Sequence, residues 1–121
     1  MDLPYGEAIQ KVTEEVKKEG FGVLTEIDVK ETMKKKLDID FRRYKILGAC
    51  NPPSAYKALQ AETEIGLMLP CNVVVYEGEG GATVVAAIDP VASMKAVENP
   101  SLEAHALEIR AKLQNVIQAM G

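Results

Sequence analysis

The chain has no tryptophan, a single histidine and only two cysteines, and each scarcity removes a class of site. A closed zinc centre needs four ligands, more than His105, Cys50 and Cys71 supply within one chain. The sequence also lacks a Cys-x-x-Cys pair, a paired-glycine dinucleotide fingerprint and a serine-histidine-acid arrangement. The standard hydrolase and oxidoreductase templates therefore do not apply, no metal site is predicted, and any cofactor is unknown.

An excess of positive charge is lacking as well. The 14 lysines and arginines are dispersed among 18 acidic residues, which gives a net charge of −4. No basic face is available to neutralise a phosphate backbone, so we do not expect nucleic-acid binding. The N-terminus lacks the pattern of a secretory signal, and no apolar run reaches the length of a membrane span. These absences predict a cytoplasmic protein without a membrane partner, in which the cysteines are more often reduced than bridged.

The 121 residues fit a single domain, 1–121, that can bury an ordinary hydrophobic core. Aromatic residues make up only 5% of the chain, so Val, Ile, Leu, Ala and Met must build that core. Apolar residues at helical spacing, together with capping residues such as Asp28, Asn51, Asp89 and Asn99, predict a series of helices. These predicted helices cover residues 5–19, 29–37, 52–61, 90–97 and the long amphipathic stretch from 101 to the C-terminus.

Alternating or β-branched runs predict four strands between these helices, at residues 21–27, 44–50, 71–77 and 83–88. The run Val73-Val74-Val75 indicates a central strand that is buried on both faces. The glycine-rich segment 77–81 predicts a hairpin between the last two strands. The predicted fold class is therefore α+β, a single domain with a largely antiparallel twisted sheet covered by helices and a long C-terminal amphipathic helix.

The most distinctive motif is a repeated cysteine-asparagine pair. Cys50-Asn51 ends one predicted strand before Pro52, and Cys71-Asn72 begins another after Pro70. If these strands are neighbours, both thiols line one edge of the sheet. The positive end of the following helix favours the Cys50 thiolate, but two prolines there remove amide donors, so we expect moderate activation.

Other polar residues near these strand ends extend the candidate ligand-binding set. The full set is Cys50, Asn51, Cys71, Asn72, Tyr44 and Glu26. Gly48 leaves its face of the strand open near Cys50. The plain structural alternative is that each cysteine is a small buried hydrophobe and each Asn or Pro supplies a turn. His105 is expected to be a half-buried structural histidine at the edge of the last apolar stripe, with no partner that the sequence identifies.

Four segments carry a resemblance to a known family: residues 20–29 (GFGVLTEIDV), 44–52 (YKILGACNP), 66–76 (GLMLPCNVVVY) and 88–90 (IDP). In these the chain resembles the uncharacterised bacterial and archaeal family called domain of unknown function 302, over nearly its whole length. The resemblance implies a compact α+β domain and a homodimer. It implies no function, and it transfers no catalytic residues. Family members usually carry a strand before the first helix. Only Met1–Leu3 corresponds to it here, so either the start is trimmed or that edge strand is vestigial, and an exposed sheet edge would then be expected to invite pairing.

Three functions stay open. The first hypothesis is a small homodimeric ligand-binding domain in which Cys50 and Cys71 line a cleft. The second is a thiol-dependent redox or transfer enzyme that uses Cys50 as its reactive group. The third is a structural dimerisation module with buried, inert cysteines. The sequence does not decide whether the protein is an enzyme, or which cofactor or ligand it would take.

Overall fold

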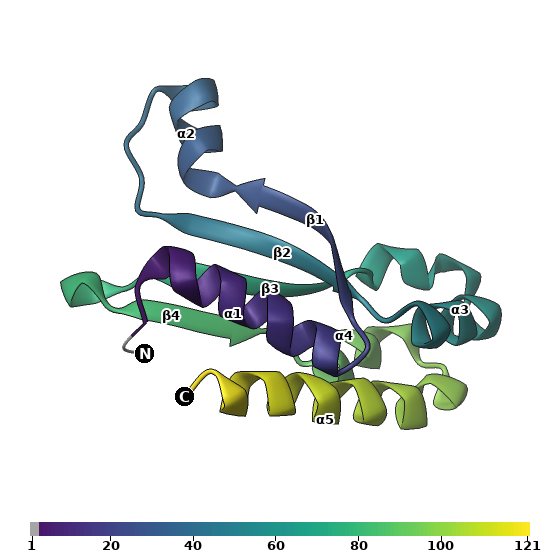
Figure 1. Ribbon diagram of the computed structural model, residues 1–121. Helices are drawn as coiled ribbons and strands as arrows, with labels where there is room; N and C mark the ends of the chain where they lie inside the picture. The colour runs from purple at the N-terminus through teal and green to yellow at the C-terminus, as the bar shows by residue number, and fades with distance from the viewer. Residues whose placement is uncertain (1–2) are drawn as a thin grey trace.

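A four-stranded antiparallel sheet in the order β1-β2-β3-β4 forms one layer of the computed structural model, which describes residues 3–121 (Figure 1). The strands are β1 (Gly22–Asp28), β2 (Tyr44–Cys50), β3 (Cys71–Glu77) and β4 (Thr83–Ala87). Because strand order follows chain order, every connection joins neighbouring strands. The helices α2 (Val29–Leu37) and α3 (Pro52–Ala61) lie in the first two connections, and a glycine turn makes the third.

A helical layer covers one face of this sheet. The first helix, α1 (Tyr5–Lys18), packs on β1, β3 and β4, and the last, α5 (Glu103–Ala119), packs on α1 and β4 (Figure 1). The short helix α4 (Pro90–Met94) lies against α5, and 3₁₀ turns at Thr63–Met68, Glu79–Gly81, Lys95–Val97 and Pro100–Leu102 complete the connections. The predicted α+β class, the antiparallel sheet and the long C-terminal helix are confirmed.

The main core lies between the sheet and these two helices. Alternate residues of β2 and β3 point into it, and the apolar stripes of α1 and α5 meet them. Its buried members include Ala8, Val12, Val16, Leu47, Ala49, Val73, Val75, Ile109, Leu113 and Val116. A second, smaller core beneath α3 and α4 contains Ala58, Ile65, Met94, Leu102 and Ala106. The chain is thus a two-layer domain with a satellite core at one end.

Local capping explains where several helices begin. Asp28 Oδ1 accepts a hydrogen bond from the Glu31 N–H at 3.0 Å, and Asn51 Oδ1 accepts one from the Ser54 N–H at 3.3 Å. Asp89 Oδ1 accepts from the Val91 N–H at 2.9 Å, which starts α4 directly after the sheet. Each cap satisfies an amide that the first turn leaves unpaired. The predicted starting residues of α2, α3 and α4 are confirmed.

The opposite face of the sheet differs from the prediction. β3 has a strand on each side and is central, but its burial on both faces was a wrong expectation: Val74 is half-buried and Asn72 is exposed, because no helix covers them. The space above Gly48 is also closed rather than open, since Thr25 and Pro70 occupy it. Most of the expected remnant of an N-terminal strand lies outside the described residues, and Leu3 packs against the main core.

Candidate functional site

The pairing of β2 with β3 brings the two cysteines to the same end of the sheet. Ala49 is the register partner of Cys71, so Cys50 and Cys71 lie one residue apart across the strand pair. Both line a small pocket of about 20 Å³, together with His105 from α5 and Met94 from α4. Two cysteine thiols, a methionine thioether and an imidazole therefore border one space, although these residues are spread over nearly half the chain.

The two thiols differ in environment. Cys71 is 7% exposed, and burial, with a smaller contribution from the neighbouring Cys50, raises the pKa of its thiol above the ordinary value. Cys50 is only half-buried. A raised pKa keeps the Cys71 sulfur protonated and a poor nucleophile at neutral pH. Cys50 is thus the more accessible of the two.

The register also bears on whether the thiols can bridge. Cys71 lies opposite Ala49, and Cys50 lies opposite Gly22 on the other side of β2. Successive side chains of a strand point to opposite faces, so Cys50 and Cys71 are not a cross-strand pair with converging Cβ atoms. Both cysteines are free thiols. The register therefore does not favour a disulfide between them.

Asn51 lines the same pocket, but the fold already uses its side chain. Besides capping α3, its amide donates a hydrogen bond to the Glu19 carbonyl oxygen at 3.4 Å. It is 8% exposed and lies against Gly20, whose φ of +85° turns the chain at the end of α1. The side chain therefore joins the end of α1 to the start of α3, which is a structural role.

The remaining predicted site residues lie elsewhere. Tyr44 stands at the far end of β2, where its ring stacks on Tyr76 with centroids 5.2 Å apart. Glu26 is exposed on β1, 3.9 Å from the Lys45 ammonium. Asn72 follows Cys71, but it is exposed on the uncovered face of the sheet. The structure thus brings together Cys50, Asn51 and Cys71 and leaves the other three outside that pocket.

His105 is the pocket residue that the sequence did not connect to the cysteines. It lies on α5, half-buried, and burial lowers the pKa of its imidazole below the ordinary value of 6.5. The nearby Glu108 carboxylate opposes this shift, and Lys57 adds to it. Only its place at the edge of the apolar stripe hinted that it faces other elements. At neutral pH the uncharged form, which can both donate and accept a hydrogen bond, prevails.

This histidine has a measurable consequence for stability. Because its pKa is lower in the folded protein than in the unfolded chain, the unfolded chain binds more protons as the pH falls below about 7. Stability that is present above the unfolded pKa is therefore lost as the pH falls toward the folded pKa. We expect His105→Gln to show a shallower loss of stability between pH 7.5 and pH 5.5 in urea unfolding. Equal slopes in the two proteins would contradict the lowered pKa.

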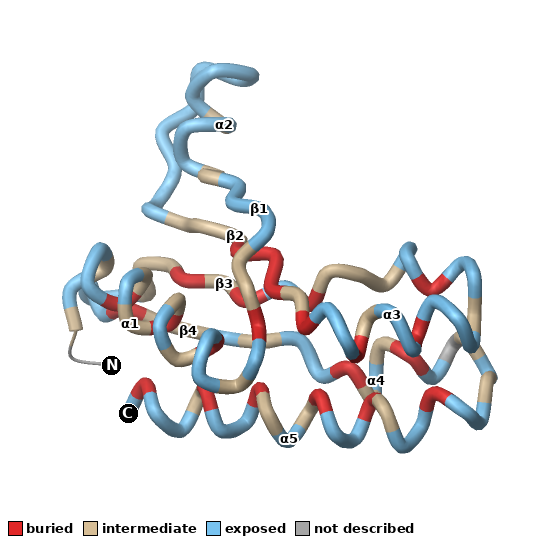
Figure 2. The backbone as a smooth tube through the Cα atoms, turned by 45° about the vertical axis from the view of Figure 1, so that its right-hand side comes forward, coloured by how far each residue is buried: buried red, intermediate tan, exposed pale blue. Residues whose placement is uncertain are grey.

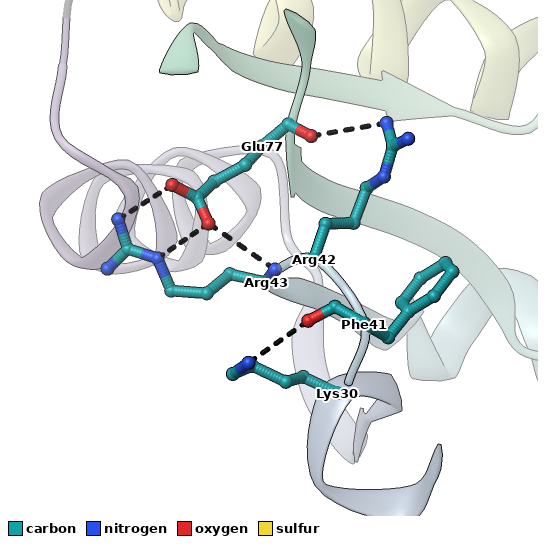
Figure 3. Close-up of polar contacts among 5 residues, drawn as sticks. All are labelled: Lys30, Phe41, Arg42, Arg43 and Glu77. Carbon is teal, nitrogen blue, oxygen red and sulfur yellow. Dashed lines mark hydrogen bonds and ion pairs between the residues drawn. The ribbon is translucent and has the colours of Figure 1, made fainter. Parts of the chain in front are cut away.

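A second polar cluster fixes the segment that leads into β2 (Figure 3). The Arg43 guanidinium holds the Glu77 carboxylate through Nε at 2.9 Å and Nη2 at 3.0 Å, and it lies 4.9 Å from the centre of the Tyr5 ring. Arg43 lowers the pKa of the Glu77 carboxyl. Nearby, the Lys30 ammonium donates to the Phe41 carbonyl at 3.0 Å. The Arg43–Glu77 contacts attach the return segment, residues 38–43 between α2 and β2, to the end of β3. The Lys30–Phe41 hydrogen bond holds α2 against the same segment.

Neither a metal-binding cluster nor a membrane-spanning helix is found in the part of the chain that the structure describes. Within residues 3–121, no group of three or more His, Cys, Asp and Glu residues is arranged to hold a metal ion. None of the described helices combines the length and the apolar character needed to cross a bilayer.

Comparisons with known proteins agree with the fold. A family model described as "Domain of unknown function DUF302" matches residues 1–120. The crystal structure of an uncharacterized conserved DUF302 protein from Bacillus stearothermophilus superposes with a TM-score of 0.91 at 32% identity. The match covers 98% of this chain and 92% of that one. Curated protein sequences show no significant match. The chain therefore belongs to the DUF302 family, whose function is unknown.

Proposed function

We propose that this protein is a homodimeric binding domain in which Cys50 and Cys71 line a site for a small ligand. The supporting observation is the shared pocket: the β2–β3 register brings both cysteines to one end of the sheet, and α5 adds His105. The proposal assumes the cytoplasmic setting expected from the sequence, where both thiols remain reduced.

The lining of the pocket favours a particular kind of ligand. Phe21 and Ile109 are buried apolar neighbours, while the two thiols, the His105 imidazole and the polar side chains of Asn51 and Ser54 are the groups able to make polar contacts. Such a mixture, mostly apolar with a few polar groups, is typical of small-molecule sites. The volume of about 20 Å³ is enough to hold one water molecule. The site as it stands accommodates one small group, such as the end of a larger molecule.

Met94 provides a way to enlarge that space. Its side chain is 8% exposed and lies between the pocket and the satellite core. Methionine has three freely rotating bonds and adapts to irregular gaps at low cost. Rotation of Met94 would widen the pocket from the α4 side without moving a strand.

The enzyme alternative rests on Cys50 as the reactive group, since it is more exposed than Cys71 and precedes the start of α3. The raised pKa of Cys71 and the register argue against a facile dithiol–disulfide cycle. The structural alternative, with inert thiols, is favoured only by the burial of Cys71 and by the small volume.

Thiol reactivity separates these functions. In the folded, reduced protein we expect iodoacetamide to modify Cys50 roughly tenfold faster than Cys71 or more, because burial protects Cys71 and disfavours its thiolate. The urea-unfolded chain, in which both thiols are open, is the control and should show similar rates. Equal and slow modification of both cysteines in the folded protein would contradict an accessible site.

Native mass spectrometry tests the binding proposal itself. Protein purified under reducing conditions should give a dimer that retains a small molecule, and the Cys50→Ala/Cys71→Ala variant should give a dimer that has lost it. Leu67→Ala, an 81% exposed position that does not line the pocket, should retain it. A dimer without bound mass would favour the structural alternative, and a monomer would overturn the proposed homodimer.

A further inference from the structure

The uncovered face of the sheet carries an unusual amount of apolar surface. Ile27, Ile46, Val74 and Ala86 are register partners in turn, so they form one row across all four strands. Tyr44, Tyr76 and Val84 form a second row beside it. Antiparallel sheets that face water normally present polar residues on that side. Neither row contains a charge, and Ile27 is 49% exposed, so these two rows have the composition of a covered surface, whereas the third row of this face, Thr25, Gly48 and Asn72, is polar or small.

The size of this face limits what it can do alone. Four strands of five to seven residues span roughly 20 Å by 20 Å, or about 400 Å². A stable interface buries about 800 Å² on each partner. The sheet face thus supplies about half of what a stable dimer needs, and an adjoining surface must supply the rest.

Residues 29–43, which we call the arm, provide such a surface. The arm contains α2, stands clear of the helical layer and lies at the opposite end of the molecule from α5 in both views (Figures 1 and 2). Its helix buries no residue, and Leu37, Ile39 and Phe41 are 61%, 49% and 39% exposed. An isolated helix of nine residues is marginal in water, because packing supplies most of a helix's stability. A hollow of about 460 Å³ lies between α2 and residues 39–40 of the segment that returns to β2.

Charge indicates what fits against the arm. The arm has six basic and three acidic residues, a net charge of +3, whereas the rest of the chain has eight basic and fifteen acidic residues, a net charge of −7. The Arg43–Glu77 and Lys30–Phe41 contacts hold the base of the arm in place (Figure 3). A basic, anchored arm on an otherwise acidic molecule complements a second copy of that molecule.

We propose that a second copy of this chain packs on the uncovered sheet face, with the arm of each copy reaching over the acidic body of the other. The interface would be isologous, so each copy contributes the same sheet rows and the same arm. This inference rests on the proposed homodimer and specifies the surface that forms it; it does not depend on what the cysteine pocket binds.

Sedimentation equilibrium of the full chain tests it with a matched pair of variants. Ile27→Glu places a charge in the apolar row, and Leu107→Glu places one at an equally exposed site, 50%, on α5 of the opposite layer. We expect Ile27→Glu to raise the dimer Kd by about thirtyfold or more, the effect of a central interface residue, and Leu107→Glu to leave it unchanged. Ala86→Glu, in the same row on β4, should reproduce the loss if Ile27→Glu folds poorly by circular dichroism.

Charge variants of the arm test the proposed interface independently of the sheet-face variants. The variant Lys34→Glu/Lys35→Glu/Lys36→Glu changes the net charge of the arm from +3 to −3 and should weaken the dimer. Wild-type affinity should also fall with rising salt. A dimer that withstands the sheet-face variants, or one that only Leu107→Glu disrupts, would overturn this surface while leaving the homodimer standing. A wild-type monomer would overturn both.

Discussion

Leu47→Ala is expected to lower the free energy of unfolding by about 2 to 5 kcal/mol, which is the range for large-to-small changes in a closed core. Leu47 is 1% exposed on β2 and is one of the largest fully buried side chains. It pairs across the sheet with Val73 and faces the layer formed by α1 and α5. Removing three carbon atoms there loses burial and leaves a cavity that the two helices cannot fill without moving.

Urea unfolding at one fixed protein concentration measures this effect, and the fixed concentration keeps any dimer contribution equal between variants. Leu67→Ala is the matched control, because Leu67 is 81% exposed on the Thr63–Met68 turn and should change stability by less than about 0.5 kcal/mol. A loss at Leu47 as small as that at Leu67 would show that the core is not closed as described.

Gly48→Ala is expected to destabilise the protein by about 1 to 3 kcal/mol, for the opposite reason. A Cβ atom at residue 48 would lie 2.7 Å from Pro70 Cγ and closer still to Thr25 Oγ1. Thr25 can change its rotamer, but the ring of Pro70 is rigid. Adding one methyl group therefore forces β1 or the segment before β3 to shift.

The same unfolding measurement applies, with Gly66→Ala as the control. A Cβ atom at Gly66 meets nothing within 4 Å, so that change should be neutral or slightly stabilising. Thr25→Ala combined with Gly48→Ala should recover part of the loss by relieving one of the two contacts, which a double-mutant cycle detects. An unchanged stability in Gly48→Ala would mean that the contact above Gly48 is looser than the structure indicates.

The candidate site was only partly predictable. Cys50 and Cys71 lie at one edge of the sheet because β2 and β3 are adjacent and antiparallel. From the sequence, this adjacency can only be assumed. Tyr44 and Glu26 were grouped with them because polar residues near strand ends often converge. Tyr44 begins β2 while Cys50 ends it, so the length of the strand separates them. His105 lies far away in sequence, and no local pattern links it to a thiol.

The sequence by itself determined which segments form helices and strands, with ends that fall within about three residues of those in the structure. Periodicity, caps such as Asn51 and turns such as Gly80-Gly81 act over a few residues, and the four motif segments were enough to recognise the family. Only the tertiary structure decided which face of the sheet is covered, that α2 projects as an arm, and that His105 lines the same pocket as the cysteines. These outcomes depend on contacts between segments distant in sequence, whose register and packing no local pattern specifies.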